Sequence, residues 1–194
     1  MLILASASPR RRELLARIGV DAIVRPSDID ESQHDGEAPL AYVQRVAAGK
    51  AAACARGAGE WVLAADTIVE LEGDVLGKAA DEAEAMVMLR RLAGRTHRVT
   101  TAVNLVGAID TRALLVTSEV DMTAASEEVL ADYVACGEWR GKAGAYAVQG
   151  IAAAMVRAVR GSITNVIGLP LAEVAALLRE TGAAEVSFRR GSPA

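Results

Sequence analysis

The chain has 194 residues, with 21 Lys and Arg against 25 Asp and Glu, and a formal net charge of −4 at pH 7. This length allows one large domain or two small lobes, and roughly 70% of the unfolded surface can be buried without disulfides or metal ions. The acidic balance argues against a nucleic-acid-binding protein, and no apolar run reaches the roughly 18 residues that predict a membrane span.

Cysteine and histidine are scarce, with two of each, and the two cysteines, Cys54 and Cys136, lie far apart. We therefore expect reduced thiols and no structural zinc site. The segment Met1–Ala5 is apolar but lacks a basic leader, so no signal peptide is predicted and we expect a cytoplasmic protein. His34 lies in a polar loop and His97 begins a strand, and we expect both to be structural or surface residues.

Strands and helices are predicted to intermix along the whole chain. Pro9 follows a suitable N-cap, Ser8, and Gly19 ends the first helix. The apolar patterns predict strands at 2–5, 20–25, 61–70, 96–106, 112–122 and 155–159, and a final short strand at the end of the chain. They predict helices at 9–18, 39–56, 81–93, 126–136 and 170–181, and residues 26–32 form an acidic loop. The β-branched runs 96–106 and 112–122 are predicted to form a long hairpin, so we expect a mixed-sheet α/β fold.

The junction between the first strand and helix carries a candidate phosphate site. Ser6 and Ser8 precede three arginines, Arg10, Arg11 and Arg12, in the first turn of the helix. Cations at a helix N-terminus oppose the macrodipole, at a cost of roughly 0.3–1 kcal/mol each. A bound polyanion would offset this cost, whereas the simpler interpretation is a capped helix with a solvated basic face.

Acidic residues form a second candidate group. Glu31 ends an acidic loop that, taken alone, fits a solvated turn. Asp66, followed by Thr67, lies within the most apolar strand, where an unpaired charge would be expensive to bury. Asp66 is therefore predicted either to cap structure or to be held for a cation or a water molecule.

Three lysines and a glutamine complete the candidates. Lys142 lies in a glycine-containing turn, 141–144, from which its ammonium could reach phosphate oxygens, and Lys78 follows Gly77. The simpler interpretation of each of the three lysines is a solvated surface residue, and this is the favoured interpretation for Lys50 taken alone. Gln149 follows a strand-like run, 145–148, and its amide could read a nucleobase edge or simply end a strand. Since only 3% of residues are aromatic, polar groups such as Gln149 should carry much of any base discrimination.

Together these segments resemble the Maf family of septum-formation-type nucleoside triphosphate pyrophosphatases. The segments that carry the resemblance are 4–11, 29–31, 65–69, 76–78, 96–99, 142–146, 149–150 and 166–171. The resemblance implies an elongated mixed β-sheet flanked by helices, like that of inosine triphosphatases, with a central cleft. It also implies one domain over residues 1–194, with two lobes around that cleft, and cleavage of a nucleoside triphosphate between the α and β phosphates.

The resemblance assigns a role to each candidate. Asp66 would be the general base and, with Glu31, would hold Mg²⁺ or Mn²⁺. Arg10, Thr67 and Gln149 would set specificity, because a Gln-Gly pair resembles the branch that acts on dTTP and UTP, whereas Glu-Gly is typical of the 7-methyl-GTP branch. The triphosphate would be bound by Ser6, Ser8, Arg11, Lys50, Lys78 and Lys142.

Two positions depart from the family pattern. Ala79 stands where proline often follows the lysine, which affects loop stiffness, and Gly141 stands where a carboxylate often precedes Lys142. Alternative hypotheses are a 7-methyl-GTP or inosine/xanthosine triphosphate pyrophosphatase and a non-catalytic nucleotide-binding regulator of division. A small nucleotide is the expected partner, without nucleic acid or membrane, and a homodimer is expected by analogy.

Overall fold

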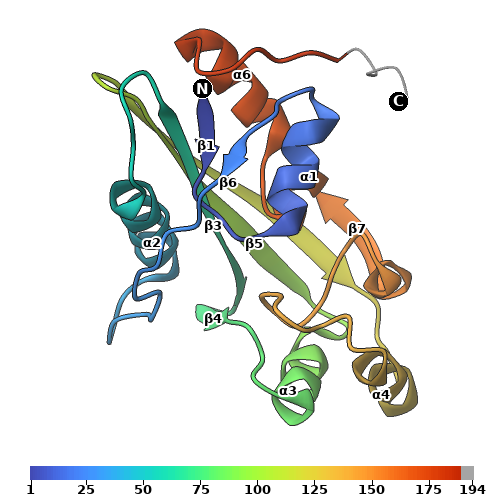
Figure 1. Cartoon of the computed structure of the whole chain (residues 1–194). Helices are drawn as coiled ribbons and strands as arrows, with labels where there is room; N and C mark the ends of the chain where they lie inside the picture. The colour runs from blue at the N-terminus through green and yellow to red at the C-terminus, as the bar shows by residue number, and fades with distance from the viewer. Residues whose placement is uncertain (189–194) are drawn as a thin grey trace. The chain divides into compact units, whose positions relative to one another are not determined.

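The computed structural model describes residues 1–188, which form a mixed α/β fold with a seven-stranded sheet (Figure 1). The strand order is β2-β1-β3-β5-β6-β7, with β4 paired to β3. The strands are β1 (Leu2–Leu4), β2 (Ile23–Val24), β3 (Trp61–Leu71), β4 (Asp74–Leu76), β5 (Thr96–Val106), β6 (Thr111–Met122) and β7 (Val156–Arg160). The predicted fold class, a mixed sheet flanked by helices, is confirmed.

The helices begin close to their predicted residues. They are α1 (Pro9–Arg17), α2 (Pro39–Ala53), α3 (Glu82–Leu92), α4 (Glu127–Ala135), the 3₁₀ helix η1 (Ile151–Met155), α5 (Ile163–Ile167) and α6 (Leu171–Thr181). The side chains of Asp81 and Ser126 cap α3 and α4 as expected, whereas Ser8 occupies the N-cap of α1 without a side-chain capping bond. Neither β4, η1 nor α5 was predicted, and no final strand forms between Gly182 and Phe188. Residues 189–194 of the predicted 1–194 domain lie outside the described residues.

The chain divides into two compact units. The first comprises 1–66, 101–116 and the segment that begins at Gly168, and the second comprises 67–100 and 117–167. Strand β3 passes from one unit into the other between Asp66 and Thr67.

The first unit is built on a parallel arrangement. β1 pairs in parallel with β2 and with β3, with Leu2 opposite Trp61 and Leu4 opposite Leu63. Such central strands are buried on both faces, and the burial of β3 is nearly continuous from Val62 to Asp66. Ala51 of α2 and Cys54, the residue that follows the helix, are buried in the core beside this sheet. The carboxylate of Asp66 therefore lies in an apolar layer.

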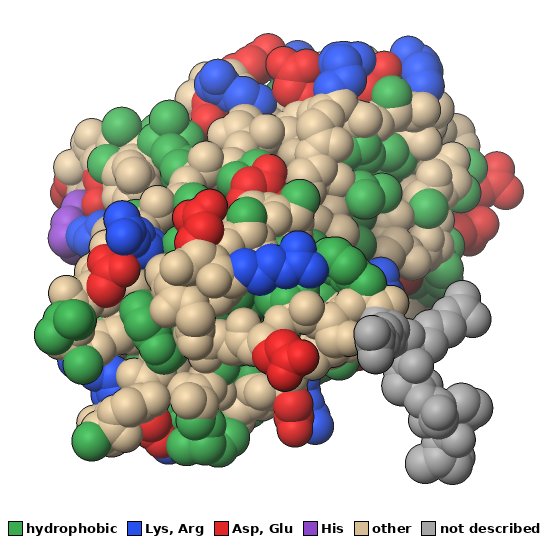
Figure 2. Space-filling view, turned by 90° about the horizontal axis from the view of Figure 1, so that it is seen from above, with side chains coloured by type: hydrophobic (Ala, Val, Ile, Leu, Met, Phe, Trp, Pro, Cys, Tyr) green, Lys and Arg blue, Asp and Glu red, His purple; other side chains and the backbone are tan. Residues whose placement is uncertain are grey.

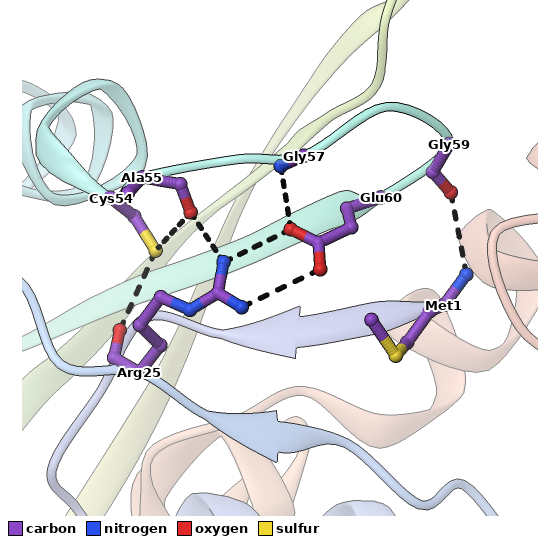
Figure 3. Close-up of polar contacts among 7 residues, drawn as sticks. All are labelled: Met1, Arg25, Cys54, Ala55, Gly57, Gly59 and Glu60. Carbon is purple, nitrogen blue, oxygen red and sulfur yellow. Dashed lines mark hydrogen bonds and ion pairs between the residues drawn. The ribbon is translucent and has the colours of Figure 1, made fainter.

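The entry into β3 is fixed by a polar cluster (Figure 3). The Arg25 guanidinium contacts Glu60 Oε2 at 3.0 Å and donates to the Ala55 carbonyl at 2.6 Å. The Gly57 amide donates to the same Glu60 carboxylate at 2.7 Å, and the Met1 ammonium donates to the Gly59 carbonyl at 3.4 Å. These bonds fasten the loop between α2 and β3, so the two elements that carry Lys50 and Asp66 are joined by an ordered connection.

The second unit has a separate core. β4 pairs antiparallel with β3, and β7 pairs antiparallel with β6. Helices α3 and α4 pack side by side (Figure 1). The core includes the fully buried Leu89 and Leu92 of α3, Leu130 of α4, and the buried ring of Trp139.

The surface carries both signs of charge. On the face shown in Figure 2, basic and acidic side chains lie among one another. Exposed ion pairs also bring opposite charges together, including Arg90 with Glu127 at 2.5 Å and Arg160 with Glu119 at 2.9 Å. No helix of the described chain is long and apolar enough to cross a membrane.

Candidate active site

Lys50 lies at the centre of a buried ion cluster in the first unit. Its Nζ contacts Asp66 Oδ1 at 2.8 Å and Glu31 Oε2 at 2.9 Å. The Lys50 and Asp66 side chains are 9% and 12% exposed, whereas that of Glu31 is 40% exposed. The expectation that Lys50, taken alone, is a solvated surface lysine was wrong, because its ammonium is needed to pair a buried carboxylate.

The sequence contained a signal for the burial of Lys50. Val43, Val46 and Ala47 form the buried stripe of α2, and Lys50 follows at the next position of the same i, i+3, i+4, i+7 pattern. A lysine in an apolar stripe requires an acidic partner. Asp66 is the matching irregularity in β3, so the two exceptions to the apolar pattern satisfy each other.

Arg11 is the second buried cation of this unit. Its Nε donates to the Gly168 carbonyl at 2.8 Å, and its Nη1 donates to Ser6 Oγ at 3.0 Å. Burial lowers the pKa of Arg11, while the negative charges of Asp66 and Glu31 act in the opposite direction. The guanidinium therefore experiences the field of the same two carboxylates that contact Lys50.

The other residues of the predicted phosphate site differ in burial. Arg10 is half-buried and Arg12 is exposed, so the three arginines differ in their access to solvent. Burial lowers the pKa of Arg10, partly offset by Glu13. Ser6 Oγ accepts from the Ser8 amide at 3.2 Å, which orders the turn that leads into α1.

Helix α2 also holds the acidic loop. The Tyr42 hydroxyl donates to the main-chain carbonyl of Glu31 at 2.7 Å, and Arg45 Nη2 donates to the Ser32 carbonyl at 2.8 Å. Arg45 also pairs with Glu37, and this hydrogen bond lowers the pKa of Glu37 to about 2. The interpretation of the loop as a solvated turn was thus incomplete, and neither Tyr42 nor Arg45 was recognised as a residue that anchors it.

The carboxylates of Glu31 and Asp66 suit a hard divalent cation. Both already bind one cationic group, the Lys50 ammonium. Mg²⁺ is commonly held by one or two carboxylates together with substrate phosphates and water. Within residues 1–188 no group of three or more His, Cys, Asp or Glu side chains is arranged to hold a metal ion.

The remaining predicted residues belong to the second unit. Thr67 and Lys142 are half-buried, whereas Lys78 and Gln149 are exposed. Ala143 forms an isolated bridge with Lys78, and Lys142 Nζ donates to the Glu138 carbonyl. The run before Gln149 was predicted to be strand-like, but 145–148 is irregular and Gln149 lies in a turn.

His97 has the structural role expected of it. It is 2% exposed, and its Nε2 lies 2.7 Å from the Tyr146 hydroxyl. Burial lowers the pKa of His97 to about 4 and raises that of Tyr146, so both groups are neutral near pH 7. Cys54 and Cys136 are free thiols, also as expected.

Comparison with known proteins places these residues in a family. The family model described as "Maf-like protein" matches residues 1–181, and the chain belongs to this family.

Individual relatives cover almost the whole chain. The "dTTP/UTP pyrophosphatase" of Myxococcus xanthus is 50% identical over 94% of this chain and 93% of its own length. The protein of the same name from Cereibacter sphaeroides is 51% identical over 93% of this chain and 95% of its own length. Among solved structures, the Ham1 protein of Staphylococcus aureus is 17% identical, with a TM-score of 0.46 over 63% of this chain and 71% of that chain.

The first testable prediction concerns the burial of Lys50. Lys50→Met keeps an unbranched side chain but leaves the Asp66 carboxylate without its ammonium partner. We expect the free energy of unfolding to fall by about 3–5 kcal/mol, because breaking a buried pair leaves an uncompensated charge. Urea denaturation measures the change, and Arg12→Met, which removes an exposed cation, is the matched control with an expected change within about 0.5 kcal/mol. A Lys50→Met protein as stable as the control would contradict the conclusion that the Lys50 ammonium pairs with a buried Asp66 carboxylate.

Proposed function

We propose that this chain is a nucleoside triphosphate pyrophosphatase that hydrolyses dTTP and UTP to the monophosphate and pyrophosphate. The observation that carries the proposal is the identity of 50% and 51%, over more than nine-tenths of the chain, to relatives named dTTP/UTP pyrophosphatase. The ion cluster around Lys50 supports it, because a buried carboxylate beside two cations suits water-dependent cleavage of a phosphoanhydride.

Asp66 is the proposed general base. A water oxygen attacks the α-phosphorus, and its proton passes to the Asp66 carboxylate. The bond between the α-phosphorus and the bridging oxygen breaks, and pyrophosphate leaves with the electron pair of that bond. Because Asp66 Oδ1 is held by Lys50, we assign proton acceptance to Oδ2.

Cationic and hydroxyl groups are proposed to bind the triphosphate. In the first unit these are Arg11, Lys50 and the Ser6–Ser8 turn, of which Arg11 and Lys50 are held by buried contacts. Preorganised donors stabilise negative charge in a transition state without reorganising. Lys78 and Lys142 of the second unit receive the same role from the family resemblance alone.

Glu31 and Asp66 are the residues proposed to hold a divalent cation, either Mg²⁺ or Mn²⁺. When bound, such a cation neutralises charge on phosphate oxygens and polarises the phosphorus. The partial exposure of Glu31 supports this role, since its carboxylate is accessible to solvent as well as to Lys50.

Arg10, Thr67 and Gln149 are proposed to set substrate specificity. An exposed glutamine amide offers a donor and an acceptor to a pyrimidine edge.

A cytoplasmic location and a homodimer also stay predictions.

The proposed activity is tested by a pyrophosphate-release screen. Purified protein with Mg²⁺ should release pyrophosphate from dTTP and UTP in preference to 7-methyl-GTP, ITP and XTP. Chelation with EDTA should stop the reaction, and Mg²⁺ or Mn²⁺ should restore it. Preferred cleavage of ITP and XTP would favour the purine alternative, and nucleotide binding without pyrophosphate release would favour a regulator.

Asp66→Asn tests the general base. The substitution retains size and an oxygen that can accept from Lys50, which also keeps its contact with Glu31, so we expect a folded protein of lower stability. Because the proton acceptor is removed, we expect kcat for dTTP to fall by about 10²–10⁴-fold. Steady-state kinetics and circular dichroism provide the two measurements. Asp21→Asn, at an exposed position outside the cluster, should retain full activity. Full activity in Asp66→Asn would remove Asp66 from the mechanism.

Gln149→Glu tests base recognition. A carboxylate loses the amide donor, so the ratio of kcat/KM for dTTP to that for 7-methyl-GTP should fall by about tenfold or more. Competition between the two nucleotides in one assay measures this ratio directly. An unchanged ratio would show that Gln149 does not select the base.

A further inference from the structure

The Glu138 side chain organises the turn that carries Gln149. Its Oε1 accepts from the Ile151 amide at 2.9 Å, and its Oε2 accepts from the Ala152 amide at 3.2 Å. Oε2 also accepts from the Tyr133 hydroxyl at 3.0 Å. One carboxylate therefore binds the start of η1, directly after the Gln149–Gly150 pair, and connects it to α4.

Gly150 shows how closely this carboxylate approaches the turn. A Cβ at Gly150 would lie 1.9 Å from Glu138 Oε1 and 2.5 Å from its carboxyl carbon. The φ of Gly150, −111°, lies outside the left-handed region, so what opposes a side chain here is the Glu138 carboxylate, which would have to move. The lack of a side chain at Gly150 thus allows Glu138 Oε1 to approach the turn this closely.

Glu138 lies between two residues with a proposed role, Lys142 and Gln149. Lys142 Nζ donates to the Glu138 main-chain carbonyl, while the side chain holds the segment after Gln149. Tyr133 is buried, and burial followed by the hydrogen bond to Glu138 raises its pKa, which keeps the phenol protonated as a donor. Glu138 itself was not among the residues that the sequence indicated.

We propose that Glu138 is a positioning residue that fixes the Gln149–Gly150 turn and thereby sets the preference for pyrimidine nucleotides. This inference rests on the proposed function, because it needs Gln149 to face the base. Glu138 acts through two backbone amides, those of Ile151 and Ala152, and the hydrogen bond from the Tyr133 hydroxyl holds the carboxylate that accepts from them. Charged acceptors bind amides more strongly than neutral ones, so a neutral side chain cannot substitute fully.

Glu138→Gln provides the direct test. It leaves one acceptor oxygen and turns an NH₂ group toward an amide donor. We expect faster hydrogen exchange at the Ile151 and Ala152 amides, and a fall of about tenfold in the ratio of kcat/KM for UTP to that for 7-methyl-GTP, mainly through KM for UTP. Glu128→Gln removes the same charge from an exposed position on α4 and should change neither quantity.

A merely structural role predicts a different result. Loss of stability alone would lower activity toward all nucleotides equally and leave the selectivity ratio unchanged, and that outcome would overturn the proposal. Tyr133→Phe, which removes one of the three hydrogen bonds, is the milder variant if Glu138→Gln does not fold, and should lower the ratio by about two- to fivefold. An unchanged ratio in Tyr133→Phe, with Glu138→Gln unfolded, would also overturn it.

A double-mutant cycle tests the contact itself. Gly150→Ala should reduce the selectivity ratio in the normal background, because its Cβ displaces the carboxylate, but should have little further effect when combined with Glu138→Ala. Additive effects would contradict the contact.

If the unaltered protein releases no pyrophosphate from UTP, the proposed function fails, whereas normal UTP cleavage with unchanged variant selectivity overturns only the role of Glu138.

Discussion

The pairing of Lys50 with Asp66 is the interaction on which the arrangement of the first unit depends. Both side chains are about nine-tenths buried, and each ion would cost several kcal/mol to remove from water without its partner. The 2.8 Å contact therefore fixes the position of α2 against β3. It also prepares the site, because Lys50 attracts Glu31 and brings two carboxylates to one ammonium. A requirement of stability and a requirement of chemistry are thus met by the same three side chains.

The position of Glu31 depends on residues that have no proposed role in catalysis. Glu31 reaches Lys50 because Tyr42 and Arg45 hold the loop's main-chain carbonyls. All three supporting side chains, including Lys50, come from α2, so the helix acts as a rigid frame for a segment without regular structure. Precise placement of a loop carboxylate requires such support, since loop backbone by itself is mobile.

In the second unit, an irregular segment is held by hydrogen bonds from its backbone amides to a carboxylate. Glu138 satisfies the first amides of η1, and the space at Gly150 accommodates its oxygen. His97 and Tyr146 form a neutral buried pair in the same unit. In both units, charged or polar side chains such as Lys50 and Glu138 have specific partners, which favours one conformation over many. The low aromatic content, 3%, is consistent with recognition by polar groups held in this way.

The sequence by itself determined the mixed α/β class, most helix starts, the β5–β6 hairpin regions and the family, because these depend on local periodicity, capping residues and ordered motifs. It also marked Asp66 as an exception within an apolar strand. Tertiary structure alone decided which cation satisfies it, since Lys50 lies 16 residues away and only packing of α2 on β3 brings the two together. The anchoring by Tyr42, the turn at Gln149 and the contacts of Glu138 were likewise decided by packing. Their hydrogen bonds join separate elements, which leaves no periodic trace in the sequence.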